Sequence, residues 1–494
     1  MTTRYAVAAL LLFTAAAGFA QTPVGTLTGR VTADGKPLAG VSVTATSDIL
    51  LGERATTSSA SGNYVLPALP PGTYDVEFAR EGMITVTRKA IVRVAQTSRV
   101  DSEMKASDVA ESVTVTERSE PVLHTPTIAT TFDAALIDRL PIGRSIAERV
   151  LLAPGVLDRQ NLMLIDGVEL DRDVVHESIA ETTILNGGIS AEYGRFDGGV
   201  IATVTKSGSN ELHGSIRDDV TDAADRARNT LEATLGGRVV EDRLWLFGAA
   251  RAASDDHRLQ GKANALLTPS QTLVASYVNE LSGFYTATLP HDLIVEALGS
   301  ADARVAKATY AISSHELVAG IDEHTLFVND RWSATPRLSL NLGIRRDKPR
   351  LGAVYDLGND QRIAVSYGRY EKFDELTASY ARELGHEGYV QAAAIHRDDY
   401  DAAQIHATYR LLGHVTLGGN YTWSTNENRA NGWVQFDMPF KDGELNVALL
   451  DHYDEQDNIA GITVGYAFPI HDVTTFVKTD FTDGKVRIAA GARF

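Results

Sequence analysis

The 494-residue sequence contains no cysteine and has fewer basic than acidic residues. The absence of cysteine excludes disulfides, zinc–thiolate sites, iron–sulfur clusters and a thiol nucleophile. With 46 Lys and Arg against 64 Asp and Glu, the net charge is −18, which argues against nucleic acid as the main partner. Beyond the N-terminus, no stretch has the ~18 consecutive apolar residues that a transmembrane helix needs. Any membrane embedding must therefore come from β-structure.

The signatures of common catalytic sites are also absent. His386 and Glu387 begin an H-E sequence, but the second histidine of H-E-x-x-H does not follow. There is no G-x-S-x-G, phosphate-binding loop or dinucleotide fingerprint. The acids within residues 451–457 could hold Ca²⁺, but a charge cluster between strands is more often a solvated turn. We therefore expect no enzyme, no cofactor and no metal.

Residues 1–20 have the pattern of an export signal. Arg4 precedes an uncharged stretch that ends in Gly18-Phe19-Ala20. One early positive charge, a short apolar core and small residues before the cleavage site are typical of a secretory signal peptide. A membrane anchor is the alternative, but the apolar core is short and no basic residue follows it directly. We expect cleavage after Ala20, and hence an exported protein.

Residues 23–105 consist of short alternating segments separated by Gly and Pro turns. Short strands at this spacing predict a β-sandwich. The pieces G-x-V-T-x-x-G-x-P-L-A-G-V-x-V, S-G-x-Y and P-P-G-x-Y resemble the carboxypeptidase regulatory-like domain. That resemblance implies a prealbumin-like fold, which overlaps carbohydrate-binding sandwiches. We expect a spacer with Tyr64 and Tyr74 in its core; sugar binding is the alternative.

The linker at residues 106–120 contains one β-branched, alternating segment. Pro121 and Pro126 follow it, which argues against a central strand of a sheet. An exposed strand without a partner strand is suited to β-augmentation by another protein. On period alone, the segment could equally be the last strand of the sandwich. Its residues are Glu111, Ser112, Val113, Thr114, Val115 and Thr116.

Residues 121–210 contain a short helix and Gly-rich turns. Ser145 and Glu148 form a capping box for the helix, and Pro154-Gly155 ends it. The sequence L-I-D-G-V-E follows at 164–169, and the run I-S-A-E-Y-G-R-F-D-G-G-V-I-A-T-V-T-K-S-G-S-N occupies 189–210. These motifs closely resemble the plug of Oar-like TonB-dependent outer-membrane receptors, which carry the same regulatory-like sandwich in front. The resemblance covers residues 23–215 well.

The resemblance implies a small α/β plug and places residues 111–116 at the TonB box, the strand that a TonB-like energising protein pulls. We expect Gly194, Gly198 and Gly199 to adopt positive φ or tight turns, and the charged pair of the motif to form ion pairs within the plug or with the wall. The motif residues are Asp166, Gly167, Glu192, Tyr193, Gly194, Arg195, Gly198 and Gly199. One departure is the short stretch between Val156 and Asn161, where relatives carry a longer Gly/Ser-rich loop.

Residues 211–494 alternate between apolar and polar side chains in segments of about ten residues, as transmembrane β-barrels do. Leu338, Leu340, Leu342 and Ile344, for example, share one face of their segment. The final Phe494 resembles the assembly signal of outer-membrane barrels and implies the barrel-assembly machinery and outer-membrane lipid as partners. Aromatic residues near strand ends, such as Trp423, suit the membrane interfaces.

The barrel must be wide, because a plug of about 100 residues has a radius of gyration near 13 Å. The family's barrels have 22 strands, which leaves about 13 residues for each strand and its connection, and spanning takes ~9–11. We expect an all-β-dominated fold: an N-terminal β-sandwich, a small α/β plug and an antiparallel transmembrane barrel of 20–22 strands with short loops. Longer connections are expected only near Ser282–Asp302 and Thr425–Gly432.

The resemblance implies an outer-membrane receptor that takes up an unidentified substrate when the plug is pulled. A permanently plugged binding or structural protein is the alternative, because the loops that normally bind ligands are short. A soluble secreted adhesin is a third hypothesis. In the first two cases the sandwich lies in the periplasm.

Overall fold

The computed structural model describes residues 24–106, 112–115, 125–154, 161–169 and 173–494 with short gaps. The gaps in the last range are 224–225, 255, 269–270, 279–280, 290–292, 301–303, 313, 323–324, 385–387, 399, 412, 426–427, 455–457 and 483–484. The expected signal peptide, Glu111 and Thr116 lie outside the described residues. None of the described helices is long and apolar enough to cross a membrane.

The first body is the expected β-sandwich, with two sheets in the described part of the chain. One sheet contains β1 (Gly25–Ala33), β2 (Lys36–Pro37), β5 (Asn63–Leu69), β8 (Thr97–Arg99) and β9 (Ser102–Glu103). The other runs in the order β10 (Ser112–Val115), β7 (Thr85–Val92), β6 (Gly72–Ala79), β3 (Ser42–Thr46) and β4 (Arg54–Thr57).

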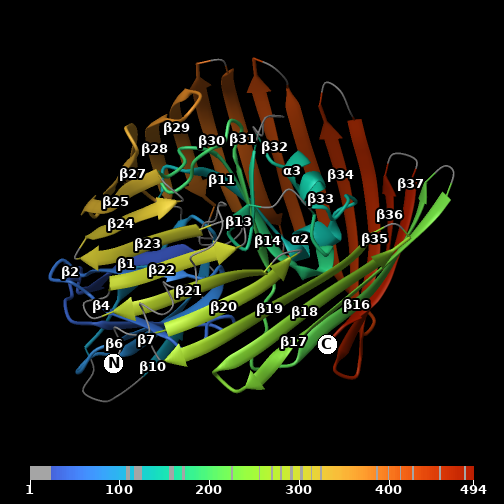
Figure 1. Ribbon diagram of the computed structural model, residues 1–494, viewed down its shortest axis with the longest axis horizontal. Coiled ribbons are helices and arrows are strands. Elements are labelled where there is room, and N and C mark those ends of the chain that lie inside the picture. The colour runs from blue at the N-terminus through green and yellow to red at the C-terminus, as the bar shows by residue number, and fades with distance from the viewer. Residues whose placement is uncertain are drawn as a thin grey trace.

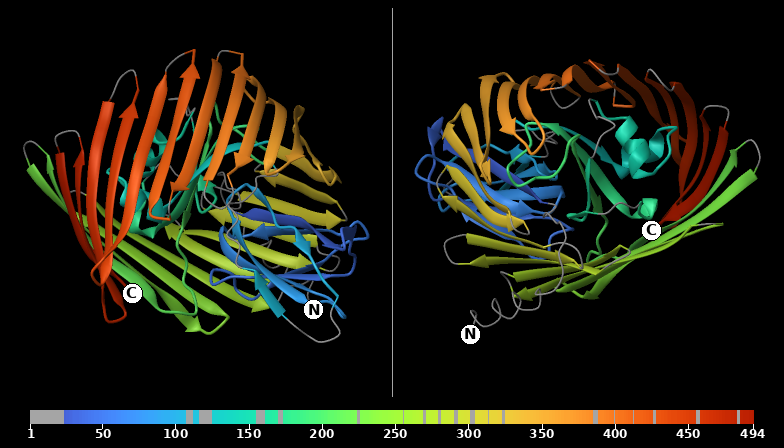
Figure 2. Two further views of the ribbon diagram at one scale, coloured as in Figure 1. Left: turned by 180° about the vertical axis from the view of Figure 1, so that it is seen from behind. Right: turned by 45° about the horizontal axis from the view of Figure 1, so that its top comes forward.

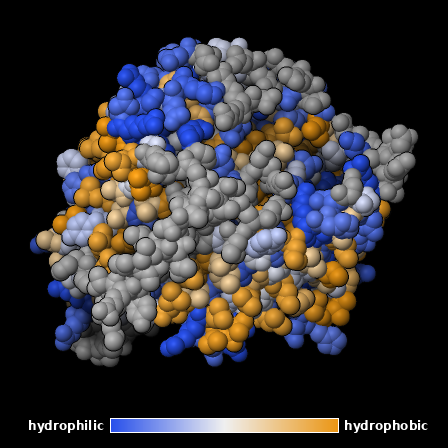
Figure 3. Space-filling view, in the orientation of Figure 1, coloured by the Kyte–Doolittle hydropathy of each residue, from blue (hydrophilic) through white to orange (hydrophobic). Residues whose placement is uncertain are grey.

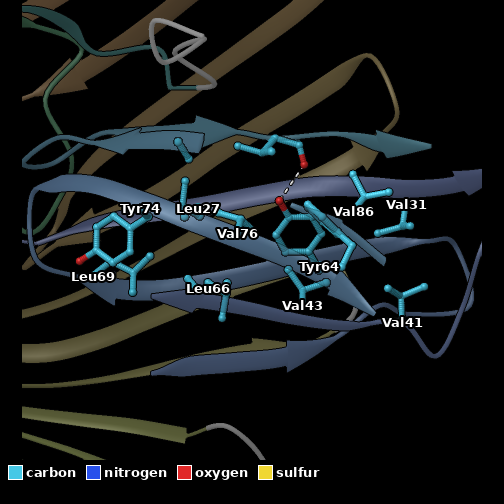
Figure 4. Close-up of a cluster of buried hydrophobic side chains, with 14 of the residues drawn as sticks. Leu27, Val31, Val41, Val43, Tyr64, Leu66, Leu69, Tyr74, Val76 and Val86 are labelled. Carbon is cyan, nitrogen blue, oxygen red and sulfur yellow. Dashed lines mark hydrogen bonds between the residues drawn. The ribbon is translucent and has the colours of Figure 1, made fainter. Parts of the chain in front are cut away.

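Apolar side chains from both sheets fill the space between them (Figure 4). Tyr64 and Tyr74 are buried there, and each hydroxyl donates a 2.7 Å hydrogen bond to a backbone carbonyl, of Val100 and Pro70 respectively. Buried aromatic rings with satisfied hydroxyls are packing residues. The prediction that these tyrosines belong to the core is confirmed.

The segment Ser112–Val115 corrects one expectation. It forms β10, which pairs in parallel with Thr85–Arg88 of β7. We expected an exposed strand without a partner, and that was wrong. The unpaired edge of β7 provides the backbone hydrogen-bonding groups that the segment needs, so it extends the sandwich sheet, as the alternative interpretation held.

The second body is a small α/β unit, which we call the plug. Its sheet has the order β11 (Ile128–Asp133), β14 (Ile179–Gly187), β15 (Val200–Thr205), β12 (Leu162–Ile165) and β13 (Val168–Glu169). The helices are α2 (Ala134–Arg139), α3 (Ile146–Leu151) and the 3₁₀ turn η1 (His176–Ser178). The predicted capping box of α3 is confirmed: Ser145 Oγ accepts from the Glu148 amide at 3.2 Å, and Glu148 Oε2 accepts from the Ser145 amide at 3.1 Å.

The third body is a closed antiparallel barrel of 22 strands, β16 to β37, in the described chain (Figure 1). The strands are β16 (His213–Ala223), β17 (Arg226–Val240), β18 (Leu244–Ala253), β19 (His257–Thr268), β20 (Gln271–Val278), β21 (Leu281–Leu289), β22 (Leu293–Ser300), β23 (Arg304–Ile312), β24 (His315–Asp322), β25 (Thr325–Thr335), β26 (Leu338–Arg345), β27 (Lys348–Gly358), β28 (Gln361–Arg369), β29 (Asp374–Glu383), β30 (Gly388–Arg397), β31 (Tyr400–Leu411), β32 (Val415–Ser424), β33 (Arg429–Phe440), β34 (Gly443–Tyr453), β35 (Asn458–Ile470), β36 (Val473–Thr482) and β37 (Lys485–Arg493).

The predicted range of 20–22 strands is confirmed, but the two expected longer connections are wrong. Most of Ser282–Asp302 belongs to β21 and β22, and β33 already begins at Arg429. Weak alternation made these segments read as loops. The last strand pairs with the first, and Gly214 and Phe494 exchange backbone hydrogen bonds of 2.8 and 3.1 Å at the seam.

The barrel is apolar outside and polar inside. All the large hydrophobic side chains that are exposed among the described residues lie between Leu212 and Phe494. In β26, Leu342 and Ile344 are exposed, whereas Asn341 and Arg345 are buried. Hydrophobic side chains accordingly gather over β16–β20 in the lower part of Figure 3. An outer wall of this kind is suited to lipid and not to water.

The sandwich and the plug lie side by side against the inner face of the barrel (Figure 2). Thr26 donates to Glu316 of the wall at 3.1 Å, and Arg93 pairs with Glu181 of the plug at 3.1 Å. Val94 packs on Ala202 and Val204 of the plug. The N-terminal body is therefore seated on both neighbours.

Because β16 and β37 close the ring, the folded mature protein should be heat-modifiable. Unheated samples are expected to migrate faster on a denaturing gel than boiled ones, since a closed hydrogen-bonded barrel has no free edge from which to open. Identical migration before and after boiling would contradict the closed ring.

Candidate functional site at the plug–barrel interface

Asp166 and Gly167 form the tight turn between β12 and β13. Both adopt positive φ, 48° and 84°. The Asp166 carboxylate accepts from the Thr205 amide at 2.9 Å, from Lys262 Nζ at 2.9 Å and from Ser276 Oγ at 3.2 Å. The D-G pair of the motif thus joins the plug sheet to β19 and β20 of the wall.

Glu192 also points at the wall. Its carboxylate lies 3.2 Å from Lys307 Nζ and 2.8 Å from Arg331 Nη2. Those cations also pair with the wall acids Glu296 and Glu316, at 3.3 and 2.7 Å. This is a plug–wall contact, one of the two arrangements expected. Arg195, in contrast, lies within the plug, 3.8 Å from Glu169.

The negative charge of Glu192 helps to hold the plug against the barrel wall. Burial alone would raise the pKa of Glu192, but Lys307 and Arg331 outweigh it and lower the pKa to about 2. A carboxyl with a lowered pKa in the folded state contributes stability above its ordinary pKa, and that stability is lost as the pH falls.

We therefore expect the seating of the plug to weaken between about pH 4.5 and pH 2. At neutral pH the Glu192 charge contributes about 3 kcal/mol, and Glu192→Gln should remove most of this acid dependence. Urea titration of plug release at pH 7 and pH 3, in the parent and the variant, measures both. Equal acid sensitivity of the two proteins would contradict the assignment.

The glycines of the motif serve close packing. None of Gly194, Gly198 and Gly199 adopts positive φ; Arg195 does, at 61°. A Cβ at Gly194 would lie 2.4 Å from Arg345 Nε, and one at Gly199 would lie 2.6 Å from the Leu185 carbonyl oxygen. The expectation of positive φ at these three glycines was wrong. What Gly194 and Gly199 lack is room for a side chain.

Three arginines of the wall hold the turn at residues 186–198 by its backbone. Arg345 donates to the Glu192 carbonyl at 3.2 Å, and Arg350 donates to the carbonyls of Ser190 and Tyr193. Arg397 donates to the carbonyls of Gly198, Asn186 and Asp197 at 3.0, 3.1 and 3.2 Å, and its Nε donates to Glu375 at 2.9 Å. We call Arg345, Arg350 and Arg397 the carbonyl clamp.

Another buried charge network surrounds Arg144, which precedes α3. Its guanidinium lies 2.8 Å from Glu177 of η1 and 3.2 and 3.4 Å from the wall acids Glu232 and Asp219. Arg144, Glu177 and Glu232 are at most 5% exposed. The Arg144 cluster comprises Asp138, Arg144, Glu177, Arg217, Asp219 and Glu232.

The charges in this cluster support one another. Burial would lower the pKa of Arg144, but Glu177, Asp138 and Glu232 outweigh it and raise that pKa. Burial likewise opposes ionisation of Asp138, yet Arg144, Arg493 and Arg217 lower its pKa. Arg144 and Asp138 therefore stay ionised, so the plug is fastened at one side by charge and at the other by the carbonyl clamp.

The wall partners in these networks were not predicted from the sequence. Glu232, Arg397 and Lys262 occupy inward positions of their strands, where a water-filled or plugged lumen needs polar groups. A charge at an inward position of a strand is a signal that could have marked these residues as plug contacts. It does not show which plug residue each of them contacts.

Comparisons with known proteins agree with this architecture. Residues 26–105 match the family of carboxypeptidase regulatory-like domains. The chain is 31% identical over 318 residues to the TonB-dependent transporter Oar of Myxococcus xanthus; the match covers 53% of this chain and only 29% of that protein.

Solved structures share the fold at low sequence identity. The siderophore receptor PirA of Pseudomonas aeruginosa matches with a TM-score of 0.57 and 14% identity, over 74% of this chain and 99% of that one. The ferric preacinetobactin receptor BauA of Acinetobacter baumannii matches with a TM-score of 0.61 and 10% identity, over 76% and 97%. At such identities the likeness establishes the fold alone.

Proposed function

We propose that this protein is an outer-membrane receptor of the TonB-dependent type, which transports its substrate when the plug is rearranged. The observation that carries the proposal is the polar seating of the plug inside a 22-stranded barrel with an apolar outer wall, in the described chain. The plug and the wall also share apolar contacts, for example at Trp433 and Leu450. The ionic and backbone contacts, however, can be exchanged for water without exposing large apolar surfaces. The proposed role is transport and not catalysis.

We infer that the segment 111–116 is the strand on which a TonB-like protein pulls. Its described part, Ser112–Val115, has one partner strand, β7, on the sandwich. Because β10 is the end strand of its sheet in the described chain, a partner could add its own strand to the other edge of β10. Pulling would then act first on the sandwich and afterwards on the plug. The substrate class stays open; siderophores are named only for the similar receptors above.

Removing residues 111–116 should abolish binding of the C-terminal domain of the host TonB-like protein. The mature protein in detergent and the deletion variant are compared by a binding titration, and both should remain heat-modifiable. Val113→Pro, which removes a backbone donor from the strand, should weaken binding at least tenfold. An exposed substitution elsewhere on the sandwich, Glu77→Ala on β6, serves as the control and should leave binding unchanged. Unchanged binding by the deletion variant would sink the coupling proposal.

A permanently plugged, non-transporting protein is the second candidate. The short connections of the barrel favour it, because outer loops normally form the vestibule for a ligand. The test is uptake in cells with and without the energising partner. Uptake that requires the partner indicates transport, whereas uptake that is the same in both kinds of cell indicates a structural role. In both cases we place the barrel in the outer membrane and the sandwich at the periplasmic end of the barrel, against its inner face.

A further inference from the structure

A cavity of about 340 Å³ lies where all three bodies meet. The sandwich contributes Ile49 and the pair Pro70-Pro71, the plug contributes Val204 and Lys206, and β19 and β20 of the wall contribute further side chains. The volume falls within the range of small-molecule sites, about 300–1,000 Å³. Because the sandwich, the plug and the wall all line the cavity, an occupant would contact each of them.

One side chain of this cavity points to a ligand. Asn264 of β19 is only 9% exposed, and its Oδ1 has no hydrogen-bond partner among the described residues. Leaving a buried acceptor unpaired costs about 1–3 kcal/mol. The neighbouring Asp166 and Lys262 pair with each other. The contact between the plug and the wall therefore does not account for the unpaired Oδ1 of Asn264.

The remaining lining defines two further properties of an occupant. Lys206 lines the cavity, and among the described residues it pairs with Glu177 at 3.9 Å, which is longer than a hydrogen bond. Burial lowers the pKa of Lys206, which an added anion would offset. Ile49, Val204 and Val274 give the cavity apolar walls.

We propose that this cavity binds a small amphipathic carboxylate that also carries an N–H or O–H donor. The carboxylate would pair with Lys206, the donor would satisfy Asn264 Oδ1, and the apolar part would pack on the valine and isoleucine walls. Short apolar peptides and hydroxy fatty acids share this chemistry. The site lies beside the sandwich, and it does not depend on whether the protein transports. Its occupant would fasten the sandwich to the plug and the wall.

Calorimetric titration of the mature protein in detergent tests the site. The probes are the dipeptide Leu-Leu, its C-terminal amide and 3-hydroxyoctanoate. We expect Leu-Leu or 3-hydroxyoctanoate, or both, to bind. Comparing the affinities of these two carboxylates shows whether a peptide or a hydroxy fatty acid is the ligand. The amide should bind at least tenfold more weakly than Leu-Leu if the peptide is the ligand. Absence of binding by both carboxylates at millimolar concentration would overturn the proposal.

Variants locate the binding. Asn264→Leu removes the acceptor at similar volume and should weaken binding about tenfold, the loss of about one hydrogen bond. Lys206→Met should weaken it by at least as much. Val274→Phe fills the cavity and should abolish binding, whereas Val477→Phe, on the outer face of β36, should leave it unchanged. Every variant is first checked for heat-modifiable migration. Equal binding by the parent and Val274→Phe would place the ligand elsewhere and refute the site.

Discussion

Replacing Arg144 by methionine is expected to release the plug from one side of the barrel. The substitution keeps much of the side-chain volume but leaves Glu177, Glu232 and Asp219 without their shared cation at 2.8–3.4 Å. Breaking a buried ion pair by removing one partner costs about 3–5 kcal/mol, because the remaining charges stay desolvated. Asp219 keeps Arg217 at 2.8 Å and Glu232 keeps Arg251 at 2.6 Å, so the loss should lie at the lower end of that range.

Planar-bilayer conductance and limited proteolysis measure this release. Arg144→Met should open channels that the parent protein lacks and should expose sites within residues 125–154. Arg238→Met is the matched control: Arg238 pairs with Glu241 at 2.9 Å, but the arginine side chain is 50% exposed, and pairs on the surface contribute about 0–1 kcal/mol. A closed, protease-resistant Arg144→Met protein would show that the cluster does not hold the plug.

The sandwich and the barrel could be predicted because their signals are local. Period-two alternation in a segment such as 338–345 needs only the segment itself, and it fixes which side chains face lipid. The number of strands came from the resemblance to a family whose barrels have 22, and the chain length and the width of the plug were consistent with it. Where alternation weakens, as in residues 282–302, the same reasoning placed a loop where β21 and β22 lie.

The contacts between bodies could not be predicted in the same way. Glu192 and Arg331 are far apart in the sequence, and nothing in either segment indicates that they meet at 2.8 Å. The alternating segment at 112–115 has the composition of an exposed strand, yet an open edge on β7 decides its neighbour. Gly194 was read as a conformational residue because the sequence does not reveal that Arg345 lies against it.

Replacing Arg397 by methionine is expected to loosen the turn at residues 186–198 while the Arg144 cluster stays intact. Arg397 is 3% exposed and serves four acceptors, namely Glu375 and three plug carbonyls. Each orphaned acceptor loses its partner in a buried site, and the unpaired Glu375 charge alone accounts for about 3–5 kcal/mol. Amide exchange in residues 186–198 should accelerate by at least a hundredfold, the equivalent of about 2.7 kcal/mol.

Two further variants separate the clamp from a general loss of stability. Arg369→Met removes an exposed arginine that pairs with Asp374 at 3.1 Å, and exchange in the turn should not change. Arg397→Lys keeps the positive charge, but an ammonium cannot reach Glu375 and three carbonyls in the planar arrangement of a guanidinium. It should therefore restore the pairing of Glu375 and only part of the protection of the turn. Full protection in Arg397→Lys would mean that charge alone holds the plug here, and that the geometry of the clamp is dispensable.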